Sequence, residues 1–402
     1  MELQIGSMPK LLFPLAVLVG FLGLAGCATI QRNPVPLDET PNAEIPEMPG
    51  VRALDGEHSP AFTQDFIQSI RDEPPDLYPP NPDGTKPYSV LILSGGGPDG
   101  AFGAGFLNGW TRTGTRPTFK VVTGISAGAL LAPFAFVGSN YDPLLKDLWT
   151  SFGKINIFRT RLSRESLGDS RPLAELIAQY VDDDLIEAVA RAHARGRRLY
   201  VGTTNLDAQR LAIWNMGAIA RSGDPDSPEL FRKVMLASAS IPIAMPPVML
   251  EVEADGVRYD EMHVDGGAVS QLFFTDATID LLKARQKLGI KAGGGHVYII
   301  FNGYADPRPQ QVERNLQKIA ERAMLTLMTS HAVGDINRIY TDARAQNSGF
   351  SYVDIPATYV SQKKSFLDTS EMHHLFAFGE KLGASKNPWR KTPPHFEEIS
   401  GY

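Results

Sequence analysis

Two short segments of the chain, the first of them continuously apolar and both predicted to be strands, each run into a glycine-rich turn and then into a predicted helix. Residues 90–93 are followed by Gly95-Gly96-Gly97, and residues 119–123 by Gly124-Ile125-Ser126-Ala127-Gly128. Short continuous apolar runs bounded by turn residues are typical of strands buried on both faces. Because such strands alternate here with helices, the sequence predicts an α/β fold, with a mostly parallel sheet flanked by helices.

The same alternation continues along the rest of the chain. Helices are expected over residues 101–110, 127–136, 172–180, 185–194, 229–239 and 276–287, strands over 198–203 and 296–301, and long helical material over 310–344. At 402 residues and 43% hydrophobic content, the chain can bury one large core. With no repeat or Gly/Ser-rich linker after residue 89, one domain over residues 88–402 with a C-terminal helical extension is the simplest organisation.

The charge of the chain argues against one class of partner. The formal net charge is -6 and the pI about 5.8, and no run of Lys and Arg is long enough to form a phosphate-binding stripe. Nucleic acid is therefore not an expected partner.

The N-terminus has the features of an export signal. Lys10 precedes an apolar stretch over residues 11–23, and Leu24-Ala25-Gly26-Cys27 places small residues before a cysteine. The stretch is shorter than the roughly 20 residues that a membrane span needs. Residues 1–26 are therefore expected to be a signal peptide, with Met8 as an alternative start because Glu2 spoils the usual basic region.

Cys27 is the only cysteine of the chain, so it can form no internal disulfide. Leu24-Ala25-Gly26-Cys27 resembles the lipobox of bacterial lipoproteins. The resemblance implies cleavage before Cys27, acyl chains attached at Cys27 and, with Ala28 next, location at the outer membrane. Several acyl chains anchor a protein stably. An ordinary cleavage site followed by a chance cysteine is the alternative.

Residues 27–87 are expected to form a tether between the lipidated Cys27 and the domain. They are rich in proline and acidic residues, with one possible short helix over 61–70. Such a stretch can hardly bury enough surface to fold alone, which favours an extended chain. For its second half, a loop wrapped on the domain surface is an equal alternative.

Ser126 is the candidate nucleophile. A serine hydroxyl attacks an ester only when a base removes its proton and the backbone presents its oxygen to the substrate. Gly-x-Ser-x-Gly between a strand and a helix gives this presentation, because the glycines leave room for a sharp turn. The helix that follows adds a dipole favourable to developing negative charge.

Gly95, Gly96 and Gly97 are the candidate oxyanion donors, since consecutive glycines let backbone N–H groups converge on one oxygen. Together with Gly100 they also match a dinucleotide-binding fingerprint. That fingerprint needs an acidic residue at the end of the next strand. Residues 119–124 contain none, so no nucleotide is expected.

The third motif is Asp265-Gly266-Gly267, which in isolation would be read as a turn. In this order and spacing, the three motifs resemble the patatin-like phospholipases, over roughly residues 89–267. The resemblance implies a three-layer fold and a Ser-Asp dyad, with Ser126 as nucleophile and Asp265 as base. A free Asp, with a pKa near about 3.9, is a weak base. Partial burial beside Ser126 would raise its pKa.

An ordinary Ser-His-Asp triad is the alternative, because several histidines follow Asp265. They are His296, His331, His373, His374 and His395. The glycine loop also departs from the family, which usually carries Arg or Lys where this chain has Asp99. A carboxylate facing the oxyanion would oppose catalysis, so Asp99 is expected to point away, in the first turn of a helix.

The resemblance and the anchor both imply a lipid or phospholipid substrate, with no metal or cofactor. Side chains that could line an acyl pocket are Phe102, Phe106, Leu130, Phe134, Phe136 and those of residues 241–248, although core packing is the default role for such residues. Two other functions remain open: acyl transfer to an alcohol by the same dyad, and lipid binding without turnover.

Overall fold

The computed structural model describes residues 31–151, 159–160, 163, 165–274 and 278–395. The expected signal peptide and Cys27 lie outside these residues. Val35–Tyr402 forms one compact unit, which is the part considered below. No helix in the described ranges is long and apolar enough to cross a bilayer.

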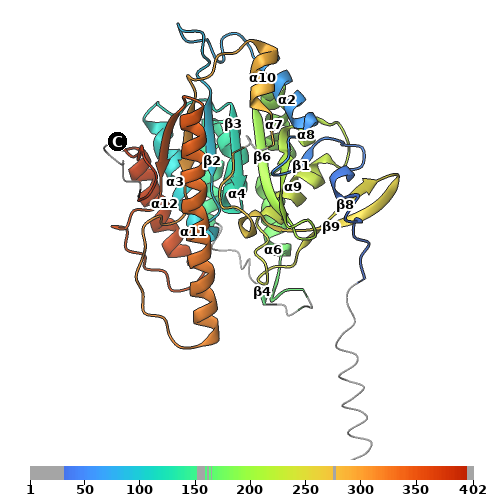
Figure 1. Cartoon of the computed structure of the whole chain (residues 1–402). Coiled ribbons are helices and arrows are strands. Elements are labelled where there is room, and N and C mark those ends of the chain that lie inside the picture. The colour runs from blue at the N-terminus through green and yellow to red at the C-terminus, as the bar shows by residue number, and fades with distance from the viewer. Residues whose placement is uncertain (1–30, 152–158, 161–162, 164, 275–277, 396–402) are drawn as a thin grey trace, which may run out of the picture. The chain divides into compact units, whose positions relative to one another are not determined.

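A nine-stranded mixed sheet is the centre of this unit (Figure 1). Its parallel strands lie in the order β6 (Arg198–Asn205), β3 (Val121–Ile125), β2 (Ser89–Leu93), β10 (His296–Ile300) and β11 (Gly349–Val353). Its antiparallel strands are β1 (Arg52–Leu54), β7 (Arg210–Asn215), β8 (Val248–Ala254) and β9 (Val257–Asp265). A separate small ribbon pairs β4 (Arg159–Thr160) with β5 (Gly168–Asp169).

The helices follow the order that the sheet connections require. They are α2 (Pro60–Arg71), α3 (Gly100–Arg112), α4 (Ala127–Val137), α5 (Asp142–Ser151), α6 (Arg171–Tyr180), α7 (Asp183–Ala194), α8 (Met216–Arg221), α9 (Ser227–Ser238), α10 (Leu281–Leu288), α11 (Leu316–Ala345) and α12 (Thr369–Gly383). Helix α4 continues past Pro133 to Val137.

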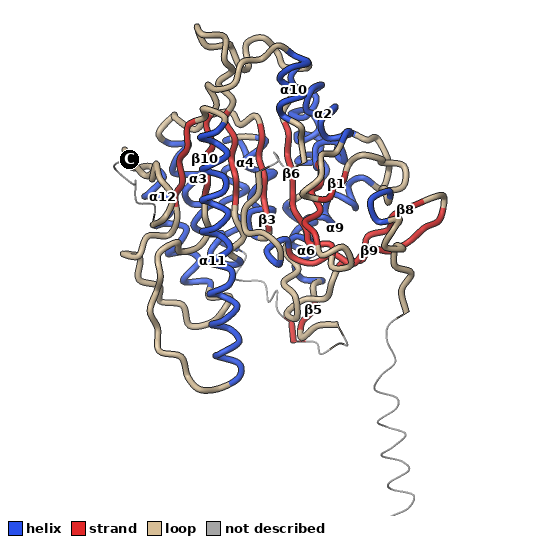
Figure 2. The backbone as a smooth tube through the Cα atoms, in the orientation of Figure 1, coloured by secondary structure: helices blue, strands red, loops and turns tan. Residues whose placement is uncertain are grey.

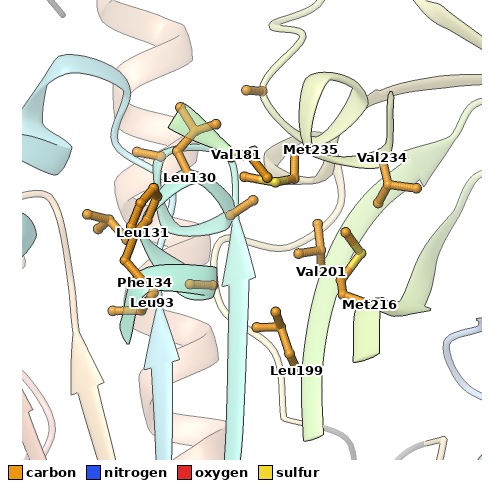
Figure 3. Packing of buried hydrophobic residues seen from close by; sticks show 14 of the residues in the cluster. Leu93, Leu130, Leu131, Phe134, Val181, Leu199, Val201, Met216, Val234 and Met235 are labelled. Carbon is orange, nitrogen blue, oxygen red and sulfur yellow. The ribbon is translucent and has the colours of Figure 1, made fainter. Parts of the chain in front are cut away.

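Alternate residues of β2 pack on opposite faces of the sheet. Leu91 and Leu93 belong to a large apolar cluster with α3, α4, α7, α9 and α12, part of which is drawn in Figure 3. Val90 and Ile92 belong to a second cluster, formed with α2 and the C-terminal half of α11. Helix α11 lies in front of the sheet in Figure 2. Helices therefore cover both faces, and the expected three-layer α/β architecture is confirmed.

The tether expected over residues 27–87 is wrong from Val35 onward, because this segment packs on the domain. Apolar side chains along it are buried, among them Ile45, Val51 and Phe62. β1 pairs with β7, and Arg52 forms an ion pair of 3.2 Å with the buried Glu261. The segment could not fold alone, but most of its apolar side chains gain burial against a core formed by the rest of the chain.

Candidate active site

Ser126 lies in a strained turn between β3 and α4. Its backbone has φ 54° and ψ −121°, a conformation that is uncommon for any residue other than glycine. The turn is tight because backbones meet there: a Cβ on Gly128 would lie 2.2 Å from the Leu93 carbonyl oxygen. The Ser126 N–H donates to Ser238 Oγ at 3.0 Å. The turn therefore fixes the direction of the serine hydroxyl.

Asp265 meets Ser126 from the end of β9. β9 pairs with β6 through Thr203 opposite Asp265, and the Asp265 N–H donates to the Ser240 carbonyl at 2.9 Å. One carboxylate oxygen accepts the Gly267 N–H at 2.8 Å, and the carboxylate also accepts the Ser126 hydroxyl.

Burial raises the pKa of Asp265 to about 6, although the hydrogen bonds from Ser126 and Gly267 lower it in part. Asp265 as a whole residue is 5% exposed, so little water solvates the charge of its carboxylate. A carboxylate with this pKa is ionised at neutral pH and is a better proton acceptor than a free Asp. The pair can therefore activate the serine without an imidazole.

The glycine loop lies beside Ser126. A Cβ on Gly95 would lie 3.3 Å from Ser126 Cβ, and one on Gly96, where φ is 151°, would lie 2.1 Å from the Asn302 carbonyl oxygen. The Gly95 N–H is directed to the Gln271 carbonyl at 3.4 Å. Within the described residues, the N–H groups of Gly96 and Gly97 have no hydrogen-bond partner. These two are the better candidates to hold an oxyanion.

Asn302 supports the glycine loop and was not singled out from the sequence. Its N–H donates to Ser94 Oγ at 2.7 Å, its Nδ2 donates to the Ser94 carbonyl at 2.9 Å, and its Oδ1 accepts the Gly103 N–H at 3.1 Å. It therefore joins the end of β10 to both ends of the loop. A buried amide directly after the apolar residues 296–301 was the available signal.

Asp335 of α11 fixes the other side of the site. One of its carboxylate oxygens accepts the Ser270 hydroxyl at 3.0 Å and the N–H groups of Gln271 at 2.8 Å and Leu272 at 3.0 Å. Gln271 in turn donates through Nε2 to the Gly267 carbonyl at 2.9 Å. α11 thus reaches the level of the catalytic turn at Asp335.

Asp99 faces away from Ser126. It ends a short 3-10 turn, Gly97–Asp99, before α3, and its carboxylate lies 4.0 Å from Lys363 Nζ with 26% of the side chain exposed. Burial raises the pKa of Asp99, and Lys363 opposes that rise. The carboxylate is thus directed to the segment before α12 and not to the expected oxyanion position.

From this geometry we expect Asp99→Asn to change turnover by less than about fivefold, because the lost charge faces Lys363 and not the oxyanion. The measurement is kcat on a soluble ester, with Lys363→Met as the matched variant that removes the other charge of the pair. A rise of orders of magnitude in Asp99→Asn alone would mean that the carboxylate acts on the oxyanion.

The space in front of Ser126 is small. A cavity of about 30 Å³ is lined by Gly97, Pro98, Ser126, Ala127, Leu130, Leu173, Ala239, Ile241, Met245, Phe366 and Leu367. Of the expected acyl-pocket residues, Leu130, Ile241 and Met245 line it. Phe102, Phe106, Phe134 and Phe136 are core residues with no exposure.

None of the five histidines that could complete a triad lines this cavity. His296 begins β10, at the sheet edge opposite the carboxyl end of β3, and its ring bonds to Ser351 at 2.8 Å. His331 and His395 are exposed, as are His373 and His374 on α12. The geometry favours the dyad over the triad.

Ser238 is, with Asn302 and Asp335, a third supporting residue whose role was not predicted from the sequence. Its hydroxyl donates to the Gly202 carbonyl at 2.7 Å while accepting the Ser126 N–H. We expect Ser238→Ala to lower the free energy of unfolding by about 1–3 kcal/mol, because the buried Ser126 N–H loses its partner. Urea denaturation measures this, and an unchanged midpoint would show that the N–H finds another acceptor.

A serine in a strained strand-to-helix turn, hydrogen-bonded to a buried carboxylate and next to a glycine loop with two N–H groups that have no partner among the described residues, has the arrangement of a serine acyl hydrolase. The comparison with family models is more specific about the class of protein. Residues 91–278, a little under half of the chain, match the model of the patatin-like phospholipases, so the chain is similar to that family over this stretch. Ser126, Asp265 and Gly95–97 all lie within the match. The family supports lipid acyl hydrolase activity.

Other comparisons add little. No curated protein matches the chain. Among solved structures, the chain is similar to VipD from Legionella pneumophila, with 12% identity and a TM-score of 0.38, over 75% of this chain and 70% of that one. Among the described residues, no group of three His, Cys, Asp or Glu side chains is placed to hold a metal ion.

Proposed function

We propose that the protein is a membrane-anchored serine hydrolase that cleaves fatty-acyl esters of phospholipids or related lipids through a Ser126–Asp265 dyad. The observation that supports this most is the hydrogen bond from Ser126 to a buried Asp265 whose pKa is raised to about 6. The matched family supplies the substrate class.

In the proposed reaction, Asp265 takes the hydroxyl proton as Ser126 Oγ attacks the ester carbonyl carbon. The N–H groups of Gly96 and Gly97 stabilise the oxyanion that forms. Collapse breaks the bond to the alcohol, which leaves with the proton from Asp265. Water then gives its proton to Asp265 and attacks the acyl-enzyme, and release of the fatty acid returns that proton to Ser126.

The proposed anchor rests on the sequence alone. Cleavage before Cys27 and acylation there would hold the enzyme on a membrane, the outer one if Ala28 has the role that it has in lipoproteins. Intact-mass measurement of the mature protein tests this. A mass increase at Cys27 that disappears in Cys27→Ser is expected, and an unmodified Cys27 would overturn the anchor.

Incubation of the purified protein with labelled phospholipid, with and without an acceptor alcohol, tests the reaction. Hydrolysis predicts labelled free fatty acid in both mixtures and none with Ser126→Ala. A labelled ester of the added alcohol as the main product would indicate an acyltransferase. Binding of the lipid with no product in either mixture would indicate a lipid-binding protein and would overturn the proposal.

A further inference from the structure

Only the second half of α11 packs on the sheet. Ala332, Ile336 and Ile339 are buried there, whereas residues 316 and 318–331 are exposed or half-buried. The first half of the helix extends past the sheet (Figure 1). Asp335 marks the level of the active site, since it binds the loop beside Gly267. At 1.5 Å per residue, Leu316 lies roughly 28 Å further along the helix, beyond the carboxyl edge of the sheet.

The projecting half carries an apolar stripe. Leu316, Ile319 and Leu327 are 86%, 53% and 60% exposed, and their spacing of three and eight residues places them on one side of the helix together with Ala323 and Met324. On the same side of the half that lies beside the sheet, the exposed residues are Gly334, Arg338, Thr341 and Ala345, none of which is a large apolar side chain. The stripe is thus confined to the part of α11 that extends past the active site.

The charges near the stripe suit an anionic surface. Residues 308–330 contain four basic side chains, Arg308, Arg314, Lys318 and Arg322, and two acidic ones, Glu313 and Glu321. This segment is therefore net positive in a chain whose net charge is −6. Within this half of α11 the basic residues are Lys318 and Arg322, on the side away from the stripe, where Leu325 is also 51% exposed. Helices that expose both apolar and basic side chains are typical of a membrane interface.

The entrance to the active site has exposed apolar side chains as well. Ile243 is 66% exposed and belongs to the loop that lines the cavity through Ile241 and Met245. Its carbonyl accepts the N–H of Leu167 at 2.9 Å, and Leu167 is 55% exposed. Phe366 at the rim of the cavity is 48% exposed. These residues lie at the same edge of the sheet as the projecting half of α11.

We infer that residues 316–331 of α11 form a membrane-docking helix, whose apolar stripe enters the acyl region of an anionic bilayer and brings the active-site entrance to the lipid surface. The inference rests on the proposed function for its choice of a bilayer as partner. It assigns the contact with lipid to α11, independently of any lipid at Cys27.

The test places a tryptophan on the stripe and uses vesicles of phosphatidylcholine and phosphatidylglycerol with brominated acyl chains, which quench tryptophan only on contact. Leu327→Trp carries the probe. Thr341→Trp is the matched control, because Thr341 is exposed on the same side of α11 but beside the sheet. We expect the emission of Trp introduced at 327 to fall at least twofold and that at 341 to stay unchanged.

Quenching measures binding and needs no turnover, so it separates this inference from the proposed reaction. Repeating it in Ser126→Ala gives the same expected result even if the protein hydrolyses no lipid. Equal emission of the two probes with and without vesicles would overturn the inference. A lipid at Cys27 would bring both variants to the vesicle. Only docking through α11 would quench the tryptophan at position 327 and leave the one at position 341 unquenched.

A second variant tests the consequence for activity. Ile319→Glu/Leu327→Glu is expected to lower hydrolysis of vesicle phospholipid at least tenfold while leaving hydrolysis of a soluble short-chain ester unchanged, and Thr341→Glu to leave both unchanged. If the double variant instead converts a dimer to a monomer in sedimentation velocity with no loss of vesicle binding, the stripe is an interface with a second copy and the inference is wrong.

Discussion

Replacing Ser126 with Ala is expected to reduce ester hydrolysis by about 10⁴-fold or more, because the covalent step loses its nucleophile while the glycine loop remains. The loss should appear in kcat, measured on both a soluble ester and a phospholipid. Since the side chain is small and the backbone turn is fixed by Gly124, Gly128 and the Ser238 hydroxyl, the fold should be retained.

Ser240→Ala is a matched control for this change. Ser240 lies close to Asp265 in the chain fold, but its hydroxyl donates to the Leu236 carbonyl at 2.8 Å and not to the site. Its activity should stay within a few-fold of wild type. Full activity in Ser126→Ala, with an unchanged circular dichroism spectrum, would show that another group is the nucleophile.

Asp265→Asn is expected to have the second-largest effect, a loss of about 10²–10⁴-fold in kcat, because an amide cannot accept the Ser126 proton. In the wild type, activity requires the ionised carboxylate. With a pKa of about 6, kcat/KM should therefore fall about tenfold per pH unit below pH 6. The low residual kcat/KM of Asp265→Asn should not fall in this way below pH 6.

The same substitution should stabilise the fold. The pKa of Asp265 is raised from 3.8 to about 6, so the folded state binds this proton more tightly than the unfolded state does. Ionisation of this buried carboxylate therefore lowers the free energy of unfolding. The decrease, roughly 3 kcal/mol, is complete above pH 6 and absent below about pH 4. Asp265→Asn avoids this cost and can still accept the Gly267 N–H.

Urea denaturation at pH 7 and pH 4 checks the sign of this effect. The Asn variant should be more stable than wild type at pH 7, and the difference should shrink toward zero at pH 4. A variant that is less stable than wild type at pH 7 would contradict the view that burial of the charge dominates at this position.

Four of the five parallel strands were predicted, most readily β2 and β10, which are contiguous apolar runs, whereas β11, with the sequence Gly-Phe-Ser-Tyr-Val, was missed. The strand expected over residues 90–93 corresponds to β2 and that over 296–301 to β10, while β3 lies two residues later than expected. The hairpin of β8 and β9 was missed, although Leu250, Val252 and Ala254 alternate with Glu251 and Glu253 before the Asp255-Gly256 turn.

The site residues could be proposed from motifs, but their supports could not. Each motif carries its own local geometry, as at the strained turn of Ser126. Asn302, Asp335 and Ser238 reach the site from elements 176, 209 and 112 positions away from Ser126 in sequence, where no local pattern marks them. The packed N-terminal segment was missed for the same reason, because its burial depends on contacts with distant strands.

The most direct test of the dyad is labelling with a fluorophosphonate, which reacts only with an activated serine, followed by mass spectrometry to locate the adduct. The proposed dyad predicts a single adduct at Ser126, a labelling rate that falls about tenfold per pH unit below pH 6, and labelling at least about 10²-fold slower in Asp265→Asn. An adduct at another residue, or unchanged labelling of Ser126 in Asp265→Asn, would contradict it.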